Sequence, residues 1–222
     1  MTLVLLHGLP LDARMWEPQL GALGDQASAP TLYAIPGETM DAWAEAVLDS
    51  VAGELVLVGA SMGGYCALAA ARRAPDRVAG IVLVGSRADP DPPERREGRQ
   101  AQLRAIADGG AAALWEAMAP SLFSAGVDPA ILERARSIAL DQPADGLARA
   151  VRAIRDRADC RDVLADLGDR SLAIFGEADP IAPPAEVEAP HKVVVAGAGH
   201  LVGMERPEDV TEHLRQVLDR WA

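Results

Sequence analysis

The sequence predicts an α/β fold, in which helices cover both faces of a parallel β-sheet. Short apolar runs recur along the chain and end in glycine or in a polar turn. Their hydrophobicity is continuous rather than alternating, which is typical of strands that are buried on both faces. Helical patterns lie between these runs, so strand and helix alternate as in right-handed βαβ units.

Five apolar runs predict strands with particular clarity. In chain order they are TLVLLHG at 2–8, ELVLVGAS at 54–61, VAGIVLVGS at 78–86, SLAIFGEAD at 171–179 and HKVVVAGAG at 191–199. A weaker candidate, TLYAIPG at 31–37, brings the expected sheet to about six strands, all parallel. The first run has no basic residues before it, so it is interpreted as a strand and not as a signal peptide.

Three helical patterns flank these strands. Asp41 is a candidate N-cap for an apolar stripe that runs to Val51. The alanine-rich segment 62–73 stops before a proline, and 206–221 carries apolar residues at helical spacing. The apolar stripe of this last helix is buried either in the chain's own core or partly against a second copy of the chain. Both a monomer and a homodimer are therefore expected alternatives.

The alternation of strand and helix stops in the middle of the chain. The segment ADPDPPERREG at 88–98 is proline-rich and charged, as hinges often are, and only helical patterns follow it until the strand at 171. We therefore expect an α/β core made of residues 1–88 and 161–222, with residues 89–160 inserted as a helical cap.

Charge and composition argue against several classes of partner. The formal net charge of −12 repels phosphate backbones and anionic lipid, so we expect neither a nucleic-acid partner nor a membrane. No apolar run approaches the roughly 20 residues that cross a bilayer. Cys66 and Cys160 form no disulfide framework, and no histidines or carboxylates share a metal-ligand spacing, so no metal is expected. These features predict a cytoplasmic protein.

The segment GASMGG at 59–64 carries the strongest sign of chemistry. It follows a predicted strand directly and opens a helix, which is the setting that the motif G-x-S-x-G requires. Gly59 and Gly63 are needed there because side chains would collide with neighbouring backbone in so tight a turn. We therefore predict that Ser61 is a nucleophile at a helix N-terminus, where a developing oxyanion is favoured.

A serine nucleophile needs a base, and the chain has four histidines. His200 follows the last predicted strand, which places it at the carboxyl edge of the sheet together with Ser61. The strand before it ends in GEAD, which offers Glu177 and Asp179 as the group that orients the histidine. We favour Asp179, because the proline that follows it fixes the loop.

Backbone amides near the serine supply an expected oxyanion hole. His7 and Gly8 end the first predicted strand and allow a turn that presents the Leu9 amide to the nucleophile. With the amide of Met62 this makes two main-chain donors. His7 itself is expected to be structural and to bond nearby backbone.

Four segments resemble the α/β-hydrolase superfamily, in particular the small bacterial esterases and the 3-oxoadipate enol-lactonases: LLHGLPLDARMW, VGASMGG, GEADPIAP and GAGHLVGMERPEDV. The resemblance covers the predicted core and not the insertion. It implies a cap over the active site and no cofactor, and it is consistent with the chain order of serine, aspartate and histidine. By position it assigns the triad Ser61, Asp179 and His200 and the oxyanion-hole amides of Leu9 and Met62. Relative to that pattern, the usual first strand pair is missing, and 181–190 leaves little room for a helix.

The expected activity is hydrolysis of a small carboxylic ester or lactone through an acyl-serine intermediate. A thioesterase or another acyl hydrolase of the same fold is an alternative, since the same groups would serve. A non-catalytic binding protein of this fold is an alternative of a different class, although such proteins usually lack a triad member. A dinucleotide-dependent oxidoreductase is disfavoured, because Lys192 is the only lysine and has no tyrosine four residues before it.

Two clusters in the expected cap have both a functional and a structural interpretation. A bulky apolar group either lines an acyl pocket or packs the cap onto the core: Trp115, Met118, Leu122 and Phe123. A basic run near the hinge either attracts a carboxylate or forms a solvated helix face: Arg95, Arg96 and Arg99.

Overall fold

A computed structural model describes residues 1–221 and contains one six-stranded sheet in the order β2-β1-β3-β4-β5-β6. Every pair of neighbouring strands is parallel, which confirms the predicted fold class. The strands are β1 (Thr2–Leu6), β2 (Ala27–Ser28), β3 (Leu55–Ala60), β4 (Val78–Val84), β5 (Ser171–Gly176) and β6 (Lys192–Val195).

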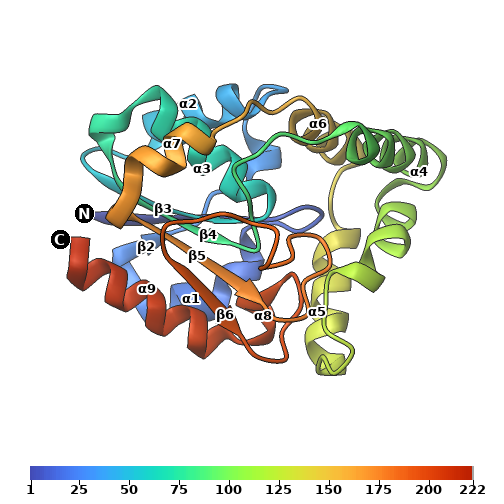
Figure 1. Cartoon of the computed structure of the whole chain (residues 1–222). Helices are drawn as coiled ribbons and strands as arrows, with labels where there is room; N and C mark the ends of the chain where they lie inside the picture. The colour runs from blue at the N-terminus through green and yellow to red at the C-terminus, as the bar shows by residue number, and fades with distance from the viewer. Residues whose placement is uncertain (222) are drawn as a thin grey trace.

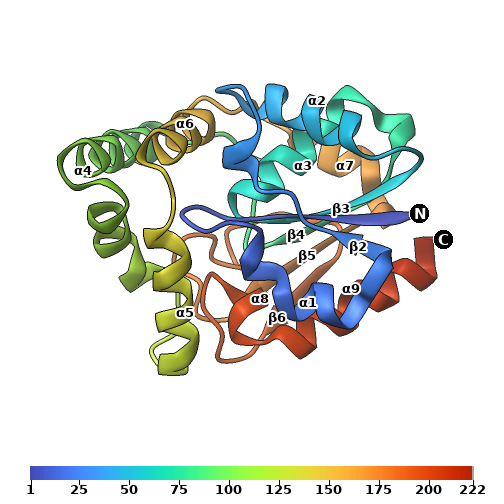
Figure 2. The same cartoon turned by 180° about the vertical axis from the view of Figure 1, so that it is seen from behind.

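Helices cover both faces of the sheet, as Figures 1 and 2 show from opposite sides. One layer contains α2 (Met40–Ser50), α3 (Met62–Arg73) and α7 (Arg161–Leu167). The other contains α1 (Glu17–Leu23), α8 (Val202–Glu205) and α9 (Pro207–Trp221). The apolar stripe of α9 lies against the chain's own sheet, where Val210, Leu214 and Val217 are buried.

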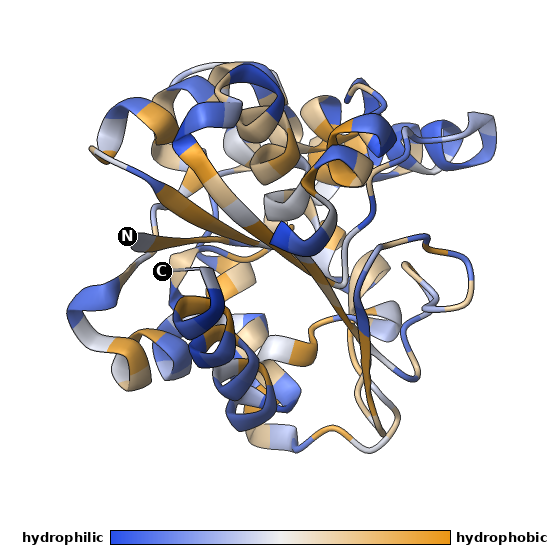
Figure 3. Cartoon of the chain, turned by 60° about the vertical axis from the view of Figure 1, so that its left-hand side comes forward, coloured by the Kyte–Doolittle hydropathy of each residue, from blue (hydrophilic) through white to orange (hydrophobic). Residues whose placement is uncertain are grey.

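The strands are apolar throughout because each of their faces meets a helical layer. Successive side chains of a strand point to opposite faces, so Leu3 and Leu5 join one core cluster while Val4 and Leu6 join the other. In Figure 3 the strands are hydrophobic along most of their length, whereas the helices show a polar and an apolar side. This arrangement explains the continuous hydrophobic runs in the sequence.

Three further helices lie beyond the carboxyl ends of the strands, at the right of Figure 1. They are α4 (Pro93–Met118), α5 (Pro129–Leu140) and α6 (Ala144–Arg155). The long α4 is interrupted at Gly110, whose φ of 62° and ψ of −146° are not helical. All three helices fall within the stretch 89–160, at the end of the sheet where α/β proteins place their ligands.

Two expectations about local structure were wrong. The run TLYAIPG forms no strand: its residues Leu32–Ala34 make a 3₁₀ turn, because the Leu32 amide donates to the buried His7 ring instead of to a neighbouring strand. The sixth strand is the two-residue β2, which pairs with β1. Helix α2 is capped by the hydroxyl of Thr39, which accepts from the Ala42 amide, and not by Asp41.

The connection from β5 to β6, residues 177–191, contains no helix, in agreement with the short segment noted in the sequence. It therefore crosses as an irregular loop that begins at the carboxyl edge of the sheet. Within residues 1–221, none of the helices has the length and apolar character needed to cross a membrane.

Candidate active site

Ser61 lies at the sharp turn between β3 and α3, the position predicted for a nucleophile. Its backbone is left-handed (φ 46°, ψ −109°), and no other residue apart from glycine has a positive φ between residues 1 and 221. Three hydrogen bonds hold this conformation. The Ser61 amide donates to Val84 O at 2.9 Å, and Ser61 O accepts from Ser86 Oγ at 2.7 Å and from the Gly64 amide at 3.0 Å. A strained serine fixed in this way is typical of a nucleophile elbow.

Glycines surround this turn because no side chain fits between its parts. A Cβ on Gly59 would lie 2.2 Å from the Gly64 amide nitrogen, and one on Gly63 would lie 2.1 Å from Leu6 O. These contacts confirm the steric reason inferred from the sequence for both positions. Gly64, which the sequence did not single out, is equally constrained, since a Cβ there would lie 2.2 Å from Ser86 Oγ.

The structure joins His200 to Asp179 in a buried pair. His200 Nδ1 and Asp179 Oδ2 are 2.9 Å apart, and each residue is 3% exposed. The other carboxylate oxygen, Asp179 Oδ1, accepts from the amides of Ile181 at 2.8 Å and Ala182 at 2.9 Å. Burial by itself would raise the pKa of Asp179, but the hydrogen bond and charge of His200 and these two amides outweigh it and lower the pKa. The carboxylate is therefore held charged and fixed in orientation.

The alternative carboxylate, Glu177, lies elsewhere. It is exposed, and its Oε2 accepts from the Gly197 amide at 3.0 Å. His191 lies at the opposite edge of the sheet, where its Nε2 pairs with Asp169 at 2.8 Å.

Ser61 and His200 line the same cavity, which has a volume of about 320 Å³. Its other wall comes from α4, its following turn and α6, through Gly98, Gln102, Met118, Ser121 and Ile154. Over residues 1–221 no hydrogen bond joins the Ser61 hydroxyl to His200. Hydrogen bonds between catalytic groups are often long before substrate binds, so the lack of this bond does not argue against the predicted pair.

The two amides expected to form an oxyanion hole lie beside this serine. Leu9 lines the cavity, and Met62 is the first residue of α3. In the described chain neither amide donates a backbone hydrogen bond, so both remain available as donors. His7 is fully buried, accepts from the Leu32 amide at 2.9 Å through Nε2, and lies 3.2 Å from Gly8 O through Nδ1. Burial lowers the pKa of His7 to about 4, so it is a neutral structural group.

The four apolar residues of the α4 region are divided between cavity and core. Met118 lines the cavity. Trp115, Leu122 and Phe123 are buried in the core cluster that also contains α9, and the rings of Trp115 and Phe123 pack with their centroids 6.4 Å apart.

A family model described as the alpha/beta hydrolase family matches residues 3–213 of the chain. The chain belongs to the alpha/beta hydrolase family. This confirms the resemblance inferred from its motifs.

The chain is also similar to individual proteins that are named as esterases or lactonases. Over 92 residues the chain is 39% identical to a pimeloyl-[acyl-carrier protein] methyl ester esterase of Aromatoleum aromaticum, a match that spans 38% of this chain and only 36% of that relative. It is 28% identical to 3-oxoadipate enol-lactonase 1 of Acinetobacter baylyi, over 93% of this chain and 84% of that protein. The structure of a thermophilic esterase from Thermogutta terrifontis (malate bound) is 35% identical, with a TM-score of 0.90, covering 100% of this chain and 90% of that one.

Two residues of this alpha/beta hydrolase that support the site were missed by the sequence analysis. Gly85 (φ 56°) packs beneath the buried pair, because a Cβ there would lie 2.6 Å from His200 O and 3.4 Å from Asp179 Oδ2. The only signal for it was a glycine directly after a predicted strand.

Glu205 is the second residue, and it fixes the loop that carries His200. This buried carboxylate accepts from the Gly199 amide at 2.8 Å and from the hydroxyl of Ser124 at 2.5 Å. It thus ties the histidine loop to the segment between α4 and α5. The only feature of the sequence that could have indicated this role is that Glu205 follows a run of mostly apolar residues in HLVGMERP.

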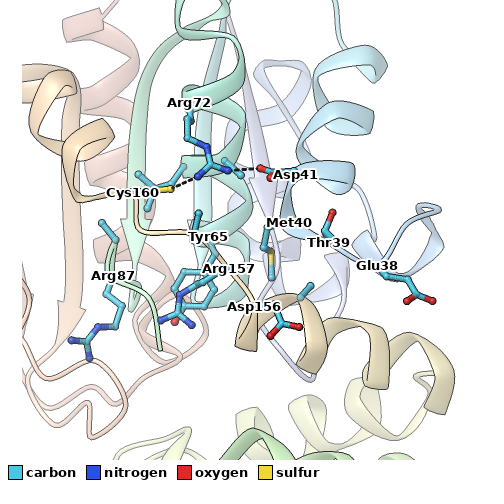
Figure 4. A pocket seen from close by; sticks show the side chains of 15 residues that line it. Glu38, Thr39, Met40, Asp41, Tyr65, Arg72, Arg87, Asp156, Arg157 and Cys160 are labelled. Carbon is cyan, nitrogen blue, oxygen red and sulfur yellow. Dashed lines mark hydrogen bonds and ion pairs between the residues drawn. The ribbon is translucent and has the colours of Figure 1, made fainter. Parts of the chain in front are cut away.

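A second cavity of about 180 Å³ lies on the other side of Tyr65, whose side chain lines both cavities. Figure 4 shows its charged groups. Arg72 pairs with Asp41 at 2.6 Å, and the guanidinium of Arg157 lies 4.1 Å from the centre of the Tyr65 ring. Among the described residues that line this second cavity there is no serine or histidine, unlike the first cavity, which contains Ser61 and His200.

Proposed function

We propose that this alpha/beta hydrolase is a serine-dependent carboxylic ester hydrolase that cleaves a small ester or lactone through an acyl-serine intermediate. The family and its esterase and lactonase relatives support ester hydrolysis in general. The serine mechanism rests on one observation above all: Ser61 and His200 open into one cavity, and His200 is bonded to the buried Asp179.

The Asp179 carboxylate sets the tautomer of the base. Because Asp179 Oδ2 can only accept, His200 carries its proton on Nδ1 and leaves the Nε2 lone pair for the serine. The two amides on Asp179 Oδ1 keep the carboxylate from rotating away. The histidine is thereby prepared as a general base.

The proposed reaction proceeds in two steps that both use this base. As Ser61 Oγ attacks the carbonyl carbon, its proton passes to His200 Nε2, and the Leu9 and Met62 amides stabilise the oxyanion. Collapse of the tetrahedral intermediate breaks the bond to the alcohol oxygen, which takes the proton from His200. A water molecule then gives its proton to His200 and attacks the acyl carbon; the acid leaves and Ser61 Oγ recovers the proton.

The helices of residues 89–160 are proposed to form the cap that closes the site. Their side chains supply much of the cavity wall opposite the sheet, and α4 packs against both α5 and α6. A cavity of about 320 Å³ suits a small substrate, since ligand pockets commonly hold about 300–1,000 Å³. The cap is therefore expected to determine the size of the acyl group.

The proposal is tested by hydrolysis of p-nitrophenyl acetate, butyrate and octanoate. We expect turnover by the wild type, with a preference for short acyl chains, and a loss of at least about 10³-fold in Ser61→Ala. Ser137→Ala, which changes an exposed serine of α5, is the matched control and keeps the wild-type rate. Equal activity in wild type and Ser61→Ala, or none in either, would contradict the serine mechanism.

A further inference from the structure

The cavity that holds Ser61 and His200 is basic, although the protein is acidic. The whole chain carries a net charge of −12. Among the described residues that line the cavity there are two arginines, Arg95 and Arg99, and no aspartate or glutamate. A low-dielectric cleft lined by one sign of charge attracts ligands of the opposite sign, even against an unfavourable overall charge.

Arg99 is paired with a carboxylate outside the cavity. Its Nε donates to Asp91 Oδ2 at 2.9 Å, and its Nη1 donates to Gln102 Oε1 at 3.1 Å. The other oxygen of Asp91 accepts from Arg157 Nη1 at 2.6 Å. One buried carboxylate therefore pairs with two guanidinium groups, and within the described chain it forms no ion pair with Arg95.

Arg95 has no such partner. In residues 1–221 it forms no ion pair, and its hydrogen bond runs from Nη2 to the backbone carbonyl of Ile181 at 2.8 Å. Its neighbour Arg87 is paired with Asp89 at 2.5 Å, so that carboxylate is also taken. Burial and the charge of Arg87 lower the pKa of Arg95, and they outweigh the opposite effects of Tyr65 and Asp91. A partly buried guanidinium without a counter-ion is costly unless an anion joins it.

Arg95 lies in the same cavity as the residues that are proposed to react with the substrate. It comes from the first turns of α4, and it lines the same cavity as Ser61 and His200. Its bond to Ile181 anchors it to the loop in which Asp179 orients the histidine. The N–H donors that this bond leaves free form part of a planar fork, which matches the two oxygens of a carboxylate better than a single acceptor.

We propose that Arg95 binds a carboxylate of the substrate, so that the preferred ester or lactone carries a free carboxylate group besides the carbonyl that is attacked. The proposal rests on the proposed function and names its substrate class. Neutral esters of the same size remain substrates, but they lack the group that the guanidinium would hold.

Matched pairs of esters test the proposal: the monomethyl and dimethyl esters of succinate, glutarate and adipate, followed in a pH-stat. Both members of a pair contain the same methyl ester, and the diester has a second, neutral methyl ester in place of the carboxylate. The measured quantity is the ratio of kcat/KM for the monoester to kcat/KM for the diester. In the wild type we expect this ratio to exceed about tenfold for at least one chain length.

Three variants distinguish recognition from a structural effect. Arg95→Gln is expected to lower the ratio by about 10- to 100-fold, because a charge-assisted hydrogen bond is lost, and Arg95→Lys is expected to restore part of it. Arg104→Gln is the control, since Arg104 is an exposed arginine of the same helix and forms no ion pair within the described chain; it keeps the wild-type ratio. Using a ratio removes any general change in turnover caused by moving the Ile181 loop.

The proposal is overturned if no monoester is preferred over its diester, or if Arg95→Gln leaves the ratio unchanged. In both cases the Ser61-dependent hydrolysis of p-nitrophenyl acetate would persist, and the proposed function would stand. If the wild type does not hydrolyse p-nitrophenyl acetate at all, the proposed function itself is refuted, and the proposed substrate class with it.

Discussion

Replacement of Asp179 by asparagine should reverse the tautomer of the histidine without disturbing the loop. The amides of Ile181 and Ala182 donate to Asp179 Oδ1 at 2.8 and 2.9 Å, so the oxygen of an asparagine is held on that side. Its NH₂ group then takes the place of Oδ2, 2.9 Å from His200 Nδ1. An amide donates to Nδ1, which moves the ring proton to Nε2. The lone pair that should accept the Ser61 proton is then lost.

The expected size of this effect is large. Loss of the correct tautomer costs about 10³- to 10⁴-fold in kcat, which corresponds to about 4 to 5 kcal/mol of transition-state stabilisation. The assay is steady-state hydrolysis of p-nitrophenyl acetate, accompanied by urea unfolding to show that the Asp179→Asn protein is folded.

Glu177→Gln provides the matched control, because Glu177 lies two residues away and its bond to the Gly197 amide survives with a glutamine oxygen. We expect this variant to keep the wild-type kcat. The reasoning is refuted if Asp179→Asn is correctly folded and retains full activity. If Glu177→Gln loses activity instead, Glu177 is the carboxylate that orients the histidine.

Three further perturbations test other parts of the structure. Gly63→Ala places a Cβ 2.1 Å from Leu6 O and should lower the free energy of unfolding in urea by about 3 kcal/mol or more. Gly21→Ala, on the open surface of α1, should be neutral or stabilising by up to about 1 kcal/mol. Equal effects of the two variants would contradict the steric argument. Glu205→Gln replaces an acceptor oxygen by a donor facing N–H and O–H groups, and should lower both kcat for p-nitrophenyl acetate and stability, the latter by about 1 to 3 kcal/mol. The pKa of His7 falls from 6.5 to about 4 on folding, so the unfolded chain binds a proton that the folded chain excludes. About 3 kcal/mol of stability, complete above pH 6.5, should therefore be lost progressively as the pH falls from 6.5 to about 4, and His7→Gln should show a shallower decline.

The sequence predicted best those features that depend on neighbours along the chain. The continuous runs that became β3 and β4 required only that both faces be buried, and Ser61 was marked by glycines within three residues of it. The placement of His200 followed from the rule that parallel strands share a carboxyl edge. These inferences use local pattern and the general geometry of parallel sheets.

Features that depend on distant contacts could not be read in this way. The role of Glu205 requires Ser124, which is 81 positions away in the chain. The stretch at 31–37 failed as a strand because His7, far from it in sequence, takes the Leu32 amide. Likewise, helical spacing shows that Trp115 and Met118 are apolar, but only the packing of the helices decides that Met118 faces the cavity and Trp115 the core.

The most direct test of the central claim is to trap the acyl-enzyme. Wild-type protein and Ser61→Ala are mixed with p-nitrophenyl acetate, quenched in acid during the first turnover, digested and analysed by mass spectrometry. We expect an acetyl group on the peptide that contains Ser61 in the wild type, formed together with a burst of p-nitrophenol, and neither in Ser61→Ala. Turnover by the wild type with acetyl on another residue, or the same burst from Ser61→Ala, would contradict the assignment of Ser61 as the nucleophile.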